Sequence, residues 1–116
     1  MPSFRMHVPI GTLHPGCSPA DVMEQAVLAL GTLHVVEQKE VEAPLVSGRR
    51  VGRVALRFAV DATVRSTEDA AARHALAVVI EHLEDTAARV APGSAVVLTR
   101  GIGGRFRPIP TMQRLR

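Results

Sequence analysis

The feature that most constrains the fold is a repeated switch in apolar spacing, from every second position to every third or fourth. Residues 4–10 (FRMHVPI) alternate, which predicts a half-buried β-strand. Residues 54–60 alternate in the same way, and Arg53 and Arg57 make the outer face of that strand basic. Residues 72–90 instead carry apolar side chains at steps of three and four, which predicts one apolar helix face. That stripe consists of Ala72, Leu76, Val79, Leu83, Ala87 and Val90.

Capping residues mark where the helices begin. Ser18 followed by Pro19 predicts the start of a first helix, because serine caps helix N-termini and proline suits the first helical position. Ser66 opens the second helix, and the acids that follow it favour the positive end of the helix dipole. Pro92 and Gly93 are expected to end that helix. The chain thus divides into strands at 4–10, 33–46, 53–60 and 95–100 and helices at 18–31 and 66–91.

The resulting order is β-α-β-β-α-β, which predicts an α+β fold. One four-stranded sheet with both helices on one face would bury the apolar stripes and leave the other face open to pair with something. Two topologies fit this order: a ferredoxin-like sandwich, or two parallel βαβ units side by side. Periodicity alone does not separate them. We expect a single domain over residues 1–107 and a basic C-terminal tail over residues 108–116.

Charge and composition exclude several classes of protein. The net charge is +3, carried by thirteen arginines and one lysine, and five arginines fall in the last seventeen residues. Such a tail can attract an acidic partner. The single cysteine, Cys17, excludes an internal disulfide. No apolar run is long enough to span a bilayer and no signal peptide is recognisable, so we expect no membrane partner and a cytoplasmic location.

The glycine-rich stretch GIGG, residues 101–104, raises the question of a phosphate-binding loop. Such a loop needs a helix directly after the glycines, and here the sequence RFRPIP follows. We therefore expect a glycine turn that leads into a short edge strand, and no nucleotide cofactor. No metal site is expected either, since His14 and Cys17 lack a second ligand pair. Nucleic acid is not expected as a partner, because the strands carry few aromatic residues.

The N-terminus is the strongest catalytic candidate. When the initiator methionine is removed, Pro2 exposes a secondary amine at the edge of the fold. A secondary amine in an apolar, cationic pocket can act as a general base near neutral pH.

The opening of the chain resembles the tautomerase superfamily. The resemblance rests on Pro2, the alternating strand up to Gly11, the late GIGG hairpin and the stretch RFAVDATVRSTEDAAARHALAVVI at residues 57–80. It implies an enzyme that moves a proton between carbon and oxygen of a small keto or enol acid. Pro2 would be the base, and Arg65 and, more weakly, Arg105 would hold the substrate carboxylate. It also implies a homo-oligomer, with a trimer favoured.

A second hypothesis needs no catalysis. The same α+β order suits a non-enzymatic, ferredoxin-like module that oligomerises through its open sheet face. Its basic tail would grip an acidic partner, as in a subunit of a larger assembly, including one of phage origin. Its support is that, apart from Pro2 and the two arginines, the sequence contains no recognisable catalytic constellation.

Overall fold

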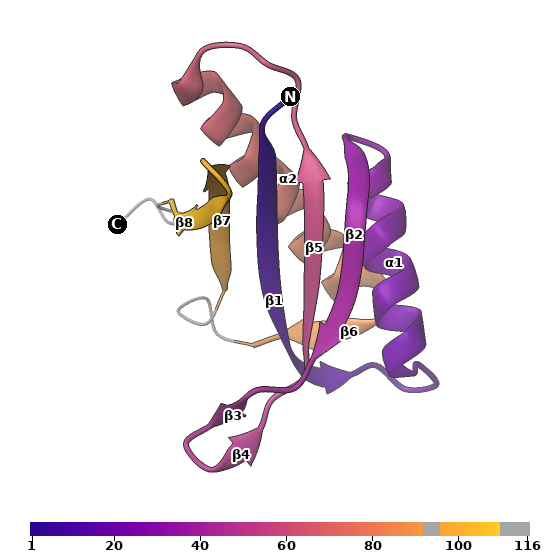
Figure 1. Ribbon diagram of the computed structural model, residues 1–116. Coiled ribbons are helices and arrows are strands. Elements are labelled where there is room, and N and C mark those ends of the chain that lie inside the picture. The colour runs from indigo at the N-terminus through magenta and orange to yellow at the C-terminus, as the bar shows by residue number, and fades with distance from the viewer. Residues whose placement is uncertain (92–95, 110–116) are drawn as a thin grey trace, which may run out of the picture.

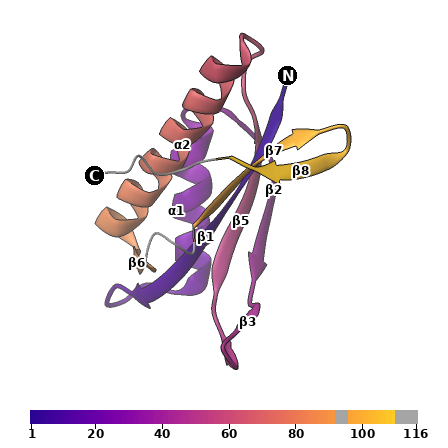
Figure 2. The ribbon, with the colours of Figure 1, turned by 90° about the vertical axis from the view of Figure 1, so that its left-hand side faces the viewer.

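The protein is described here from a computed structural model that covers residues 1–91 and 96–109. Two helices pack on one side of an antiparallel sheet, as the α+β prediction requires (Figures 1 and 2). The helices are α1 (Pro19–Gly31) and α2 (Arg65–Thr86). The strands are β1 (Ser3–Leu13), β2 (Val35–Glu42), β3 (Leu45–Val46), β4 (Arg49–Arg50), β5 (Arg53–Ala59), β6 (Ala88–Val90), β7 (Val97–Ile102) and β8 (Arg105–Pro108).

The main sheet has six strands rather than the expected four. Its order is β2-β5-β1-β7-β8, and β6 pairs with the C-terminal end of β1. Every pairing is antiparallel, so no two neighbouring strands among the described residues are parallel. Of the two additional strands, β8 is the short edge strand expected after the glycine turn, and β6 has three residues, too few for alternation to identify it.

Two predicted elements end earlier than expected. The polar strand expected over residues 33–46 ends at Glu42, and the chain then forms a separate hairpin of β3 and β4. We call this hairpin the arm; Figure 1 shows it standing away from the main sheet. The second helix ends at Thr86, and residues 88–90 turn back as β6. Their apolar spacing suited a helix, but pairing with the end of β1 satisfies their backbone instead.

The first helix begins as predicted. Ser18 is the N-cap, with its hydroxyl accepting from the Asp21 N–H, while the Asp21 carboxylate accepts from the Ser18 N–H at 2.8 Å. This reciprocal pair is a capping box. The second helix begins one residue earlier than expected, at Arg65, and its N-cap Val64 makes no side-chain cap hydrogen bond.

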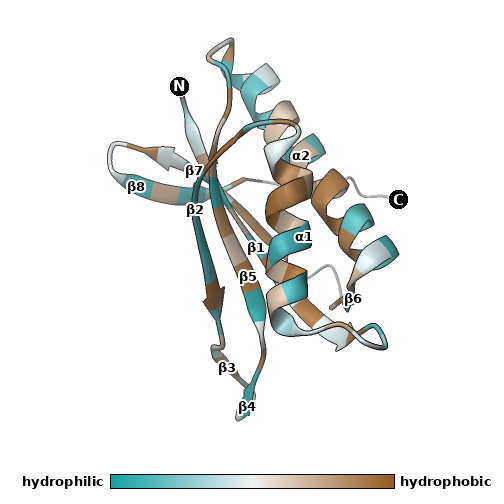
Figure 3. Cartoon of the chain, turned by 90° about the vertical axis from the view of Figure 1, so that its right-hand side faces the viewer, coloured by the Kyte–Doolittle hydropathy of each residue, from teal (hydrophilic) through white to brown (hydrophobic). Residues whose placement is uncertain are grey.

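The core lies between the helices and the inner face of the sheet. Figure 3 shows hydrophobic segments on both helices and on the central strands. The alternating residues predicted to face inward on β1 and β5 are buried there except Ile10, which is partly buried, and the rings of Phe4 and Phe58 stack at 5.9 Å. No helix among the described residues is long and apolar enough to cross a membrane. The predicted helix end at Pro92 and Gly93 and the tail from residue 110 onward lie outside the described residues.

Candidate functional site: the hollow beneath the glycine hairpin

The glycine stretch forms a tight hairpin between β7 and β8, as predicted from sequence. Ile102 pairs with Arg105, which leaves Gly103 and Gly104 as a two-residue loop. Their φ angles are 57° and 83°. A two-residue loop with positive φ at both positions is a type I′ turn, which glycine adopts without steric cost. The hairpin therefore returns the chain as the edge strand β8.

The hairpin places one aromatic ring over the open face of the sheet. Phe106 pairs across from Gly101, and a Cβ added at Gly101 would lie 3.2 Å from that ring. A side chain at this position would crowd the ring and the Ser3 carbonyl oxygen. The ring contacts two cations: the guanidinium of Arg5 lies 4.2 Å from its centroid and that of Arg57 lies 5.3 Å away. Arginine over an aromatic face is a favourable cation–π arrangement.

A hollow of about 320 Å³ opens beside this ring, and we call it the hairpin hollow. It brings together two segments that the sequence analysis identified, the start of the chain at Pro2 and the glycine hairpin. Figure 2 shows the N-terminus and the β7–β8 hairpin at the same end of the sheet. The residues that line the hollow are Met1, Pro2, Ser3, Arg57, Gly101, Gly103, Gly104 and Phe106.

Short hydrogen bonds hold the polar groups of the hollow in place. The Pro2 carbonyl accepts from the Val60 N–H at 2.9 Å, which fixes Pro2 at the end of β5. Glu37 Oε1 accepts from the Ser3 hydroxyl at 2.8 Å and from Arg57 Nε at 3.0 Å. No other described carboxylate bonds to Arg57. Its terminal N–H groups are therefore available to an anion.

The structure brings Pro2 to Arg57, and not to the two arginines predicted to hold a substrate. Arg65 is the first residue of α2, is exposed, and does not line the hairpin hollow. Arg105 begins β8 between two lining residues but is exposed and is not one of them. Sequence reasoning missed Arg57. The strand register sets it opposite Arg5, and β1 and β7 lie between its strand and β8, which carries Phe106.

Elsewhere on the open face, acids from β2 balance the basic side chains. Glu42 Oε1 accepts from Arg53 Nε at 2.6 Å and lies 3.2 Å from His7 Nδ1. Burial acts to raise the pKa of Glu42, but the bonds from Arg53 and His7 outweigh it and hold that pKa below its ordinary value. The pKa of His7 is lowered, mainly by burial. This part of the face is thus nearly neutral.

Positive charge remains near the hollow. Arg5 has no carboxylate partner among the described residues, and Arg57 shares the single carboxylate of Glu37 with Ser3. An anion entering the hairpin hollow would therefore meet a net positive field.

The described residues contain no group of three or more histidine, cysteine, aspartate or glutamate side chains that could hold a metal ion. No family model, curated protein or solved structure matches this chain.

Proposed function

We propose that the protein transfers a proton between carbon and oxygen of a small keto or enol acid, with the amine of Pro2 as general base. The observation that carries the proposal is that Pro2 and Arg57 line one hollow. A base and a cation on the same small site are what enolisation of a carboxylic acid substrate requires. The proposal needs a mature chain that begins at Pro2, so that the nitrogen is a free secondary amine.

The roles follow from the chemistry of the lining groups. The Pro2 nitrogen removes a proton from the carbon next to the carbonyl, and the C–H electron pair forms the C=C bond. The carbonyl π pair moves onto oxygen, which takes the proton back from the Pro2 ammonium. The terminal N–H groups of Arg57 hold the carboxylate, since guanidinium matches carboxylate geometry. Phe106 covers the apolar part of the substrate. Arg57 therefore takes the role that the tautomerase resemblance implied for Arg65 and Arg105.

The first test combines intact mass with turnover of phenylenolpyruvate. We expect the untagged protein to lack methionine, and Pro2→Ala to lower turnover by about a hundredfold or more. Arg57→Gln should raise KM by about tenfold, because a charged hydrogen-bond partner of the substrate is lost. Arg53→Gln is the matched control, an arginine on the same strand face outside the hairpin hollow. Unchanged turnover in Pro2→Ala, or a mass that retains Met1, would refute the proposal.

A second candidate is the non-enzymatic assembly module, and two observations favour it. The order β2-β5-β1-β7, antiparallel throughout, is the order expected of a ferredoxin-like sandwich. The arm also presents Leu45 with 63% of its surface exposed. An exposed leucine on a projecting hairpin suits contact with another subunit.

Native mass spectrometry tests this candidate directly. If the arm, rather than the open sheet face, joins subunits, the wild-type protein is an oligomer and Leu45→Ser shifts it toward monomer. Leu28→Ser is the control, because Leu28 is 58% exposed but lies on α1, away from the arm. A monomeric wild-type protein, or equal effects of the two variants, would exclude assembly through the arm.

A further inference from the structure

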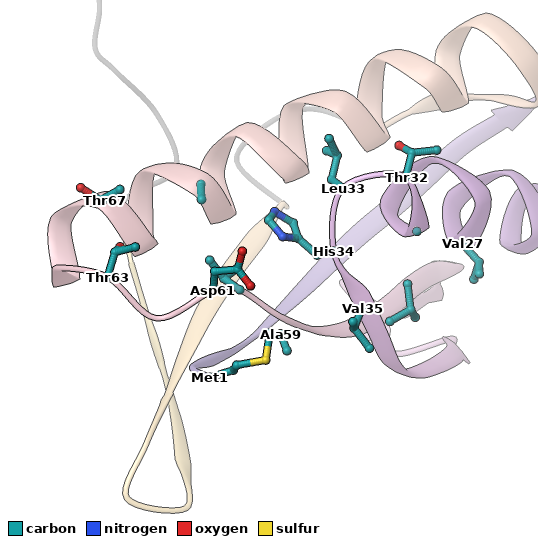
Figure 4. A pocket seen from close by; sticks show the side chains of 14 residues that line it. Met1, Val27, Thr32, Leu33, His34, Val35, Ala59, Asp61, Thr63 and Thr67 are labelled. Atoms are coloured by element: carbon teal, nitrogen blue, oxygen red, sulfur yellow. The ribbon is translucent and has the colours of Figure 1, made fainter.

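A second and larger hollow lies at the end of the sheet where β5 ends and β2 begins, and we call it the end pocket. Its volume is about 680 Å³, and the last turn of α1 and the first turns of α2 form its walls (Figure 4). Val27, Val36, Val60 and Ala71 give it an apolar lining. A pocket of this size with an apolar lining and a few polar groups is typical of small-molecule sites.

The polar groups of the end pocket divide into those already bonded and those without a bond. The Thr32 hydroxyl donates to the Ala29 carbonyl at 2.7 Å, and the Thr63 hydroxyl donates to the Val64 carbonyl at 3.2 Å. Asp61, by contrast, makes no side-chain hydrogen bond or ion pair with any described residue. It is the only aspartate, glutamate, lysine or arginine among the described lining residues, so it is the one side-chain charge of the pocket.

His34 adds a hydrogen-bond acceptor next to this carboxylate. Its ring stacks on Phe58 at 5.7 Å, and Figure 4 shows the His34 ring and the Asp61 carboxylate facing the same space. Burial lowers the pKa of His34; Asp61 acts against this shift and His74 adds to it. A neutral imidazole keeps one ring nitrogen as an acceptor at neutral pH.

We propose that the end pocket binds a small molecule with an apolar body and one protonated amine. The amine would donate to the Asp61 carboxylate and to the His34 ring nitrogen, while the apolar body would lie against the valines. The two sites differ in charge: Asp61 in the end pocket suits a cationic ligand, whereas Arg57 in the hairpin hollow suits an anionic one. The inference uses Asp61 and His34, neither of which lines the hairpin hollow; the two sites share Met1, which the proposed function removes.

Two probes of similar shape and opposite charge test the inference by NMR titration of the full chain. We expect 2-phenylethylamine to bind and to shift resonances of the end pocket, and 3-phenylpropionate not to do so. Asp61→Asn should weaken amine binding by about tenfold or more, because it removes the counter-charge. Asp85→Asn is the matched control, an exposed aspartate near the end of α2.

The outcomes are distinct from those of the turnover assay. Equal binding of both probes, equal effects of the two aspartate variants, or no amine binding at millimolar concentration would each overturn the inference. Pro2→Ala and Arg57→Gln should leave amine binding unchanged even where they abolish turnover. A loss of amine binding in those variants would show that the end pocket is not a separate site.

Discussion

At the scale of single residues, Glu68 joins three parts of the chain through one carboxylate. Its Oε1 accepts from Arg100 Nη2 on β7 at 2.6 Å, and its Oε2 accepts from the Thr63 N–H at 2.8 Å. Arg100 also donates to Asp69 at 2.9 Å and lies over the ring of Phe4. Glu68 is only 5% exposed. From sequence it was one of the acids favoured at a helix start, yet its main role is to bind the start of α2 to the sheet.

This pairing makes stability depend on pH. The hydrogen bonds from Arg100 and from the Thr63 N–H, acting against burial, hold the pKa of Glu68 below its ordinary value. A carboxyl whose folded pKa is depressed adds stability above its unfolded pKa and loses it as pH falls through the folded pKa. The contribution of Glu68 is therefore complete at neutral pH and is lost in acid.

We accordingly expect Glu68→Gln to shift the unfolding equilibrium toward the unfolded state by about tenfold at neutral pH. The difference from wild type should shrink well below about pH 4, where the wild-type carboxyl is also protonated. Urea denaturation at several pH values measures both effects. Glu81→Gln, an exposed glutamate on the same helix, is the control and should change little. A difference that is independent of pH would contradict this account of Glu68.

At the scale of elements, the β7–β8 hairpin depends on the backbone freedom of its glycines. Gly103 and Gly104 both adopt left-handed φ, which costs a residue with a Cβ about 1–2 kcal/mol. The hairpin also forms one wall of the hairpin hollow and carries Phe106 over the sheet. A distortion of this turn should therefore affect both stability and the site.

Gly104→Ala is expected to lower the free energy of unfolding by about 1–2 kcal/mol, measured by urea denaturation. Gly31→Ala provides the opposite case. Gly31 ends α1 without a positive φ, and a Cβ there would meet nothing within 4 Å. Alanine at that position should raise the free energy of unfolding by about 0.5–1 kcal/mol. If both substitutions had the same sign, backbone conformation would not be what separates these glycines.

At the scale of the whole molecule, stability comes from one apolar layer between the helices and the inner face of the sheet. Leu56 lies in the middle of β5, is fully buried and belongs to the same cluster as Phe58 and Leu83. The helices cover only this face, while the open face is lined by paired charges and by the ring of Phe106. Burial therefore concentrates in a thin layer whose side chains have little freedom to rearrange.

Leu56→Ala should accordingly lower the free energy of unfolding by about 2–5 kcal/mol, since it leaves a cavity in this layer. Leu28→Ala changes the same residue type on the exposed side of α1 and should stay within about 0.5 kcal/mol of wild type. Thermal or urea denaturation of the two variants measures the contrast. Similar losses in both would mean that α1 packs its outer side against another surface, such as a second subunit.

The sequence by itself determined the local elements of this protein. Alternation identified the strands that contain Phe4 and Phe58, Ser18 marked the start of α1, and the residues after GIGG excluded a phosphate loop in favour of a turn. These features follow from short-range physics: the two-residue period of a strand, the unpaired N–H groups of a helix start, and the φ preference of glycine.

Only the tertiary structure decided which of these residues meet. A strand's period reports which face a side chain occupies, but not which strand lies beside it or in what register. Antiparallel pairing of β1 with β5 and β7 set Arg57 and the glycine hairpin beside Pro2, while Arg65 and Arg105 stayed outside the hollow. Residues 88–90 likewise form a strand instead of the predicted helical turn, because their backbone pairs with the end of β1. Long-range pairing of this kind depends on how the loops close and how the layers pack, and no local pattern in the chain encodes it.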